Sequence, residues 1–232
     1  MLFVAYRPRE SQDKLGLPTY LEQTYTEQFN ERKPMEPLNS NNWRDYNRYK
    51  DGLPVPTPFR LPPKMFMVVK GLKRFESDFF SDNPIEWIVS GRFRAFLKDH
   101  GLLEGQYEES ELTILSTTKK SISDKQYYLL RLLRNNNSLI DFEKTPKIVS
   151  PKKPLTKTMP PMVYYPALVF QEGVQTPPMF LLDDRSYWRS FFCTEDIRAA
   201  MEQEKFLGFD FYTLEDFVQE RLEREKRFVG PG

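Results

Sequence analysis

The chain has only one cysteine and one histidine among its 232 residues. A single cysteine, Cys193, cannot form a disulfide within the chain, which fits a reducing compartment. Because His100 is the only imidazole, the sequence excludes every catalytic or metal site that requires two histidines, and no metal site is predicted. His100 is expected at the surface near the end of a helix. Cys193, in the apolar context FFCT, is expected to be a buried and unreactive thiol.

Glycine is also scarce, with 10 residues, and no GxGxxG or GxxxxGK[ST] motif is present. These motifs let the backbone approach a phosphate closely, so a nucleotide site of either type is excluded and no cofactor is expected. No apolar run approaches the ~18 residues that a membrane helix needs, and the opening MLFVAYRPRE is too short for the core of a signal peptide. The formal net charge of +1 gives no general attraction for nucleic acid. The sequence therefore favours a cytoplasmic protein that binds neither a membrane nor nucleic acid.

The chain is instead rich in aromatic residues (15%) and in prolines (19), and its length is enough to bury a substantial core. After a first strand at 2–6, the polar and proline-rich N-terminal part is expected to form an irregular wrap on the body of the protein, with a short helix over 20–29. Lysines and prolines recur in residues 146–161, which is typical of a linker. The sequence thus predicts four parts: the wrap (1–63), a first half (64–145), the linker (146–161) and a second half (162–232).

A strand–helix–strand pattern occurs twice, at an offset of 104 residues (194 − 90). In the first copy, a β-favouring run leads into Ser90, which can cap a helix by accepting a hydrogen bond from a free backbone N–H. In the second copy, Thr194 holds the same position. After each cap, apolar residues at i, i+3 and i+4 fall on one helical face. They are Phe93, Phe96 and Leu97 in the first copy and Ile197, Ala200 and Met201 in the second.

Further strands are predicted at short apolar runs, over residues 65–69, 112–115, 127–133, 164–170 and 179–182. The run at 127–133 could also be a helical turn, but a strand is favoured because polar asparagines follow so soon. A terminal helix is predicted from Thr213, where Asp216 completes a capping-box pattern. Glu220 and Arg224 on this helix are spaced to pair. The predicted fold class is α+β, with mostly antiparallel strands, a few short helices, two related halves and a C-terminal helix.

Acidic residues gather beside each of the two repeated patterns. The first group is Glu104, Glu108, Glu109 and Glu111, and the second is Asp183, Asp184, Glu195 and Asp196. Two of these carboxylates could act as the acid and base of a hydrolase such as a glycosidase. Charged turns are more commonly only solvated, so no catalytic residue is predicted and the chain is expected not to be an enzyme.

The two capped helices stand in the segments IVSGRFRAFL and FFCTEDIRAAMEQEKFLGFDF, with the turn IDFEKT between them. Together with the opening LFVAYRP, these segments resemble bacterial immunity proteins of polymorphic toxin systems, in particular the immunity families numbered eleven and forty-three. The resemblance covers roughly residues 2–217, although residues 20–61 and the terminal helix match no pattern of those families. It implies a cytoplasmic, non-enzymatic protein that occludes the active site of one cognate toxin. That toxin is expected to belong to a contact-dependent or type VI secretion system and to be encoded by a neighbouring gene.

The resemblance makes the two acidic groups candidate toxin-binding residues. Many secreted toxins act on nucleic acid and carry a basic groove, which grouped carboxylates could fill. Tyr107, Tyr187 and Trp188 would serve as aromatic anchors beside them. Two other functions stay open at this point. One is a hydrolase that uses scattered carboxylates to reverse a toxin's modification, and the other is a non-catalytic adaptor domain.

Overall fold

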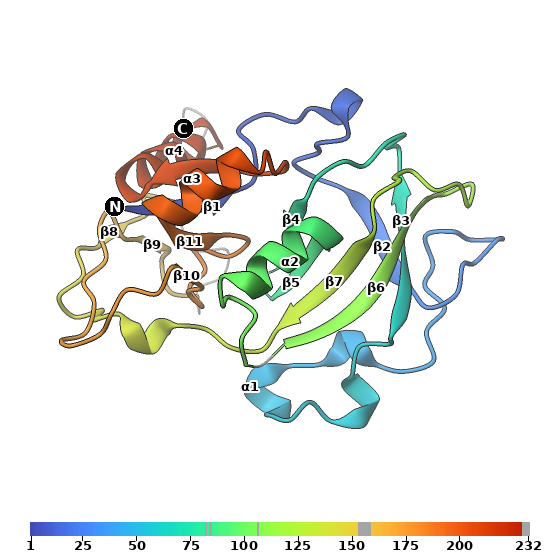
Figure 1. Cartoon of the computed structure of the whole chain (residues 1–232), viewed down its shortest axis with the longest axis horizontal. Coiled ribbons are helices and arrows are strands. Elements are labelled where there is room, and N and C mark those ends of the chain that lie inside the picture. The colour runs from blue at the N-terminus through green and yellow to red at the C-terminus, as the bar shows by residue number, and fades with distance from the viewer. Residues whose placement is uncertain (82, 84, 106, 153–158, 229–232) are drawn as a thin grey trace. The chain divides into compact units, whose positions relative to one another are not determined.

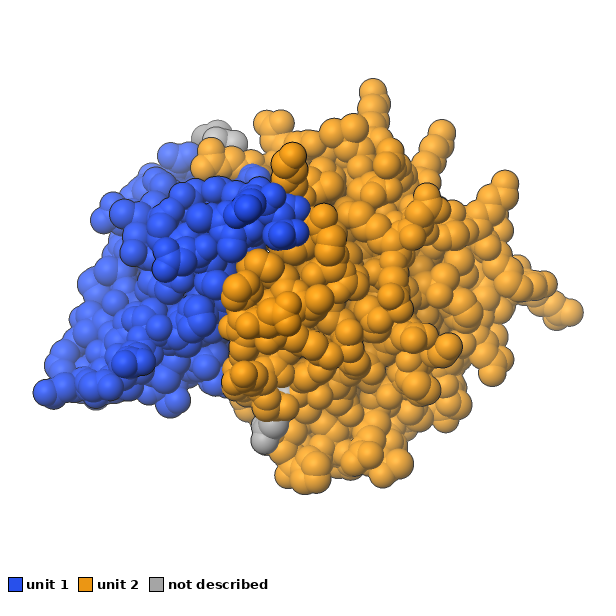
Figure 2. All heavy atoms as spheres, in the orientation of Figure 1, with its two compact units in different colours: residues 1–6, 135–204, 210–232 blue, residues 7–134, 205–209 orange. Residues whose placement is uncertain are grey.

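The computed structural model describes residues 1–81, 83, 85–105, 107–152 and 159–228. The chain forms two compact units, which Figure 2 shows in separate colours. Unit 1 contains residues 1–6, 135–204 and 210–232, and unit 2 contains residues 7–134 and 205–209. The boundaries predicted from the sequence, at residues 63, 145 and 161, stay a prediction. Part of the predicted linker, residues 153–158, lies outside the described residues.

Unit 2 is built on a six-stranded sheet (Figure 1). Across the sheet the strands are β2 (Glu22–Thr26), β3 (Lys64–Lys70), β6 (Tyr107–Ser116), β7 (Tyr127–Leu132), β5 (Glu86–Ser90) and β4 (Phe79–Ser81). The pair β3 and β6 is parallel, and every other neighbouring pair is antiparallel. The strands predicted at 65–69, 112–115 and 127–133 are confirmed. The last of these is a strand rather than a helical turn because it pairs on both sides.

The helix predicted over residues 20–29 is wrong, because this segment forms β2, which pairs with β3. Thr24 and Thr26 on β2 are buried. A β-branched side chain is stiff at χ1 and suits a half-buried strand better than a helix. Pairing with β3 therefore overrides the weak local helical pattern.

Helix α2 (Gly91–Asp99) packs on β5 and β7 and covers one face of the sheet (Figure 1). Its predicted cap is confirmed, since the Ser90 hydroxyl accepts a hydrogen bond from the N–H of Phe93 at 3.2 Å. The three predicted apolar residues of this helix are buried. Phe206, in the five-residue segment 205–209, packs on Phe93 and Phe96 with ring centroids 4.9 and 5.3 Å apart. Part of the aromatic content predicted to supply a core is thus packed around α2.

The opposite face of the sheet carries the main apolar core of unit 2. Successive strand side chains point to opposite faces, so Ile88, between Trp87 and Val89, belongs to this second core with Met67 and Leu129. The N-terminal part of the chain covers this core with Leu21 and Trp43. It contains the short elements η1 (Asp13–Leu15), η2 (Trp43–Asp45), α1 (Arg48–Asp51) and η3 (Thr57–Phe59). Trp43, the largest of these covering side chains, is 1% exposed.

Unit 1 contains a four-stranded antiparallel sheet with a separate two-stranded ladder and two helices. In order across the larger sheet the strands are β10 (Met179–Phe180), β11 (Phe191–Thr194), β1 (Leu2–Tyr6) and β12 (Asp210–Thr213). The ladder pairs β8 (Ile148–Val149) with β9 (Val163–Tyr164), η4 (Asn137–Leu139) is a short turn of helix, and the two helices are α3 (Glu195–Gln203) and α4 (Leu214–Phe228). The predicted fold class, α+β with mostly antiparallel strands and a C-terminal helix, is confirmed.

Two strands predicted in unit 1 are shorter than expected. The strand predicted over 164–170 is wrong beyond β9, because Pro166 has no N–H to donate to a ladder. The N–H of Tyr165 is also used elsewhere, since it donates to the hydroxyl of Tyr187 at 3.1 Å. The strand predicted over 179–182 ends at Phe180.

Of the two helix caps predicted in unit 1, the cap of α4 forms its hydrogen bond and the cap of α3 does not. Thr194 holds the N-cap position of α3, but its side chain makes no capping hydrogen bond. Thr213 caps α4 as predicted: its hydroxyl accepts from the N–H of Asp216 at 3.1 Å and donates to that carboxylate at 2.8 Å. The predicted pair of Glu220 with Arg224 is confirmed at 2.6 Å.

Candidate functional site

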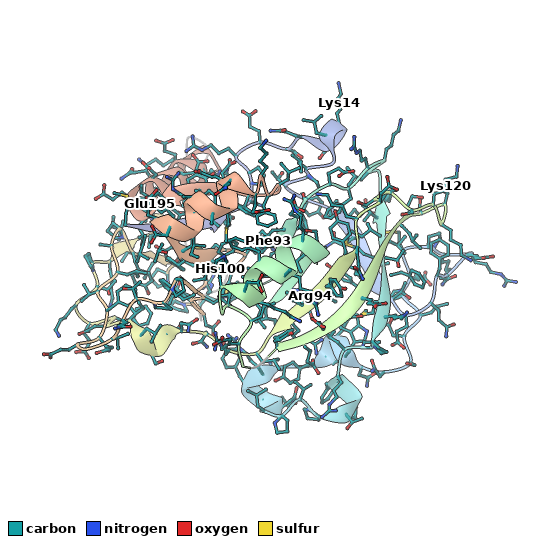
Figure 3. All side chains as sticks on the ribbon, in the orientation of Figure 1. Lys14, Phe93, Arg94, His100, Lys120 and Glu195 are labelled. Atoms are coloured by element: carbon teal, nitrogen blue, oxygen red, sulfur yellow. The ribbon has the colours of Figure 1, made fainter. Side chains whose placement is uncertain are left out.

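The first acidic group lies on β6 and on the turn before it, and most of its charge is compensated. Glu109 accepts two hydrogen bonds from Arg94 of α2, at 2.7 and 2.5 Å. Figure 3 labels Arg94 on its helix. The hydrogen bonds from this guanidinium lower the pKa of the Glu109 carboxyl. Glu111 forms an exposed ion pair with Lys64 at 3.2 Å. Glu104 is exposed on the turn that follows α2.

Glu108, the fourth member of the group, belongs to a buried cluster around Arg131. Arg131 is 1% exposed and lies 3.1 Å from the carboxylate of Glu108 and 3.3 Å from that of Glu86. Its two terminal nitrogens also donate to the carbonyl oxygens of Trp43 at 2.7 Å and Phe59 at 2.8 Å. Burial raises the pKa of Glu108, an effect that the charge of Arg131 opposes. Arg131 therefore fixes two points of the N-terminal wrap to the sheet.

The second acidic group lies in unit 1, and its members have different surroundings. Asp184 accepts hydrogen bonds from the Tyr165 hydroxyl and from a backbone N–H, both at 2.9 Å, so it stabilises its own loop. Glu195 pairs with Arg198 on α3. The remaining two differ in exposure: Asp183 is half-buried and Asp196 is exposed.

The two aromatic anchors predicted in unit 1 also differ, although they are adjacent in sequence. Tyr187 is 1% exposed, its hydroxyl donates to the carbonyl of Tyr165 at 2.8 Å, and its ring lies 5.1 Å from that of Phe217. Tyr187 is therefore a core residue and not a surface anchor. Trp188 is 39% exposed and stays at the surface.

In unit 2, a cavity of about 440 Å³ lies between the wrap and the start of β6. Its walls are Leu53, Pro54, Val55 and Arg60 from the wrap, Tyr107 and Glu108 from β6, and Leu133 after β7. Leu53, Pro54 and Arg60 are exposed, so the cavity opens to solvent. Its volume lies within the range of about 300–1,000 Å³ that is typical of binding pockets. Glu108 and Tyr107 were predicted as site residues, whereas the wrap residues were not.

We name residues 47–60 the proline platform. On it, Tyr49 is 77% exposed and Leu53 is 44% exposed. The guanidinium of Arg48 lies 4.9 Å from the centroid of the Tyr49 ring and donates to its hydroxyl at 2.9 Å. Asn47 caps α1 by accepting from the N–H of Tyr49 at 3.0 Å. Tyrosine and arginine beside apolar residues are typical of binding hot spots.

A second cavity of about 530 Å³ surrounds the N-terminal end of α2. Its buried acid, Asp78, accepts hydrogen bonds from the hydroxyl of Ser90 at 2.7 Å and from the ammonium of Lys125 at 3.1 Å. The N–H of Leu207 donates to the other oxygen of the same carboxylate at 2.9 Å. These charges and donors are satisfied within the chain, so this cavity joins elements of unit 2 and carries no further site.

The remaining candidates for chemistry are the single cysteine and the single histidine. Cys193 is buried, and burial raises the pKa of its thiol to about 12, which keeps it protonated and unreactive. His100 ends α2, half-buried, with its ring 4.1 Å from that of Phe96. Within the described residues, no group of three or more His, Cys, Asp or Glu side chains could hold a metal ion. In the same part of the chain, no helix has the length and apolar composition to cross a membrane.

The family model described as Immunity protein 43 matches residues 9–221. The chain belongs to this family. The predicted resemblance to immunity family forty-three is thereby confirmed, and the match includes both the proline platform and the cavity. Members of Immunity protein 43 are immunity proteins of polymorphic toxin systems, so this chain neutralises a toxin and has a cognate toxin as its partner. No curated protein matches the chain.

Proposed function

We propose that this immunity protein binds its toxin directly through the proline platform and thereby occludes the toxin's active site. The observation that carries the proposal is the exposure of Tyr49 and Leu53 on one segment, of which Leu53 lines the 440 Å³ cavity. A protein of the Immunity protein 43 family needs a shaped surface for its toxin. The platform supplies an aromatic anchor, an apolar rim and a recess within one unit.

Contacts within the chain tie the flanks of the platform to the sheet, which favours binding. Arg131 holds its flanks through the carbonyl groups of Trp43 and Phe59. Ordering a loop on binding costs free energy, and a surface that is already fixed avoids that cost. Of the acidic residues predicted to contact the toxin, Glu108 lies in this surface. The assignment of toxin contact to the other acidic residues and to Trp188 stays a prediction.

The binding surface is tested with the product of the gene next to that of this chain, purified as the candidate toxin. Tyr49→Ala and Leu53→Asp each remove or oppose an anchor, and we expect each to weaken the affinity about tenfold or more. Tyr20→Ala is the matched control, because Tyr20 is also 77% exposed in unit 2 but lies outside the platform. Isothermal titration calorimetry gives the three dissociation constants. Full affinity in both platform variants would remove the platform from the interface.

Occlusion is tested by titrating the toxin's activity with this chain. Blocking an active site predicts that inhibition is complete at one molecule per toxin molecule and that substrate competes with the immunity protein. A toxin that stays active in the saturated complex contradicts occlusion. Complete inhibition at much less than one molecule of this chain per toxin molecule would instead support the alternative in which the chain acts as an enzyme on the toxin.

A further inference from the structure

We infer that the toxin presents an acidic segment to the proline platform, with carboxylates around one apolar side chain that enters the cavity. This inference rests on the proposed function and names the chemistry of the partner surface. It differs from the sequence-based expectation, in which this chain supplies the carboxylates and the toxin the basic groove. Three features of the platform support it: the balance of charge, the way the cations are held and the composition of the cavity.

The platform concentrates positive charge on a chain that is almost neutral. Within residues 47–60 there are three cations, Arg48, Lys50 and Arg60, and one acid, Asp51, which gives +2 (3 − 1). Since the whole chain carries +1, the other residues sum to −1 (1 − 2). Local charge of one sign steers a partner of opposite sign and sets its orientation.

The single acid of the platform is turned toward its own backbone. The carboxylate of Asp51 accepts a hydrogen bond from the N–H of Asn47 at 2.7 Å and closes the turn of α1. The nearest acid in the cavity, Glu108, pairs with Arg131 at 3.1 Å. Both carboxylates are therefore engaged within the chain, and the field at the platform surface comes from its cations.

The cations are held in different ways, and Arg60 lines the cavity. Arg48 lies over the ring of Tyr49, which keeps its guanidinium beside an exposed aromatic side chain. Arg60 lines the cavity and donates from Nε to the carbonyl of Val55 at 3.2 Å. Lys50 is exposed on α1. A guanidinium fixed in this way is suited to bind a carboxylate through two hydrogen bonds.

The cavity itself favours an apolar side chain. Leu53, Pro54, Val55 and Leu133 supply most of its walls. Its volume of about 440 Å³ is ample for one large side chain of a partner. A leucine or aromatic residue in the cavity would place neighbouring residues of the same segment next to Arg60 and the α1 cations. Carboxylates at those neighbouring positions would pair with these cations.

The test measures association rates of the toxin, purified as above, with the double variant Lys50→Glu and Arg60→Glu. The matched control is Lys14→Glu with Lys120→Glu, since both lysines are exposed in unit 2 and lie far from α1 in Figure 3. Both double variants change the net charge by the same amount. We expect the platform variant to slow association about fivefold or more at low salt, and the control less than about twofold. The difference should shrink as salt is raised.

Each outcome of this experiment supports or overturns the inference. Faster association of the platform variant would show a basic toxin surface, and equal slowing of both variants would show a general charge effect. Either result overturns the inference. If Leu53→Asp weakens binding while the platform charge reversal leaves association unchanged, the proposed function stands and the acidic segment is rejected. If neither Tyr49→Ala nor Leu53→Asp weakens binding, the proposed function itself fails. Lys50→Glu alone, at an exposed position, repeats the measurement should the double variant not fold.

Discussion

The guanidinium of Arg94 lies 4.3 Å from the centroid of the Tyr128 ring, where α2 crosses β7. In unit 1, Arg198 of α3 lies 4.8 Å from the centroid of the Phe3 ring on β1. Each arginine stands four residues after the helix cap. Tyr128 pairs across the sheet with Val89, the residue before the cap Ser90. Phe3 pairs in the same way with Cys193, the residue before Thr194. The two units thus repeat one cation–aromatic contact at equivalent positions of helix and sheet.

The strands around these contacts also have the same arrangement. Strands β5 and β6, which flank α2 in sequence, both lie antiparallel to β7, and β11 and β12 have the same relation to β1. The central strand follows the helix in unit 2 but is the first strand of the chain in unit 1. The predicted relation between two halves stays a prediction, and the shared arrangement is limited to this core. It does not extend to β3, because no described strand of unit 1 takes the matching place beside β12.

A first prediction concerns the ion pair between Glu109 and Arg94. Glu109→Gln should lower the free energy of unfolding by about 1 kcal/mol at pH 7, because the pair is bidentate and only partly exposed. The folded-state pKa of Glu109 is lowered, so its contribution is fully present above the unfolded pKa of about 4.3 and is lost as pH falls through the folded value. Denaturant melts of both proteins between pH 7 and pH 3 measure this loss.

Glu111→Gln is the control, on the same strand. Its partner Lys64 is largely exposed, so the substitution should change stability by less than about 0.5 kcal/mol at either pH. An equal effect of the two substitutions, or a Glu109 effect that grows at low pH, would show that the geometry of the Arg94 pair is not what stabilises it.

A second prediction concerns the apolar faces of the two capped helices. Phe96 is 9% exposed and Met201 is 1% exposed. Phe96→Ala should cost about 3–5 kcal/mol and Met201→Ala about 2–5 kcal/mol, because each truncation removes buried area and leaves a cavity. Chemical denaturation gives both values. A cost below about 1 kcal/mol at both positions contradicts the burial and would make these faces candidates for an interface.

A third prediction concerns Gly208, which has φ +108° and sits against β4. An added Cβ would collide with the carbonyl oxygen of Phe79 and lie 2.9 Å from the Cβ of Ser77. Gly208→Ala should therefore cost about 3 kcal/mol or more, from backbone strain plus overpacking. Gly71→Ala is the control, because Gly71 has φ +82° but no atom within 4 Å of an added Cβ, and should cost only about 1–2 kcal/mol. Thermal melts measure both costs. An equal loss of stability in the two variants would show that the added Cβ at residue 208 does not collide with Phe79.

The sequence predicted the elements whose signals are local. The cap at Ser90, the cap at Thr213 and the apolar spacing of α2 each depend on residues within one or two helical turns. The strand at 20–29 was mistaken for a helix because its state depends on β3, about 40 residues away in sequence. Tyr187 and Trp188 could not be told apart, because burial of an aromatic ring depends on which neighbours the fold supplies.

The candidate site was even less predictable. The platform residues carry no periodic pattern, and their order depends on Arg131, which is 88 residues from Trp43 in sequence. Nothing near Arg131 in the sequence YYLLRLL indicates that it is buried. The acidic groups were visible as clusters in the sequence, but the fold supplies cations to Glu108 and Glu109 that only the tertiary structure reveals.

The last prediction concerns Arg131 as the residue that positions the platform. Arg131→Lys should lower the free energy of unfolding by about 3–5 kcal/mol, because one ammonium cannot satisfy two carboxylates and two carbonyl groups at once. Arg134→Lys is the control, since the hydrogen bonds of Arg134 to two carbonyls are long, at 3.3 and 3.5 Å, and the substitution should cost less than about 1 kcal/mol.

Because Arg131 joins the wrap to the sheet, its loss should open the platform before the rest of unit 2 unfolds. Limited proteolysis with mass spectrometry should then find cleavage of the Arg131→Lys protein within residues 42–60 under native conditions, whereas the Arg134→Lys protein stays intact there. The toxin affinity of Arg131→Lys should fall with that cleavage, since a loosened platform must be ordered again on binding. Arg131→Lys protein that keeps a protease-resistant platform, whatever its stability, would show that the apolar contacts of Trp43 hold the wrap without the arginine.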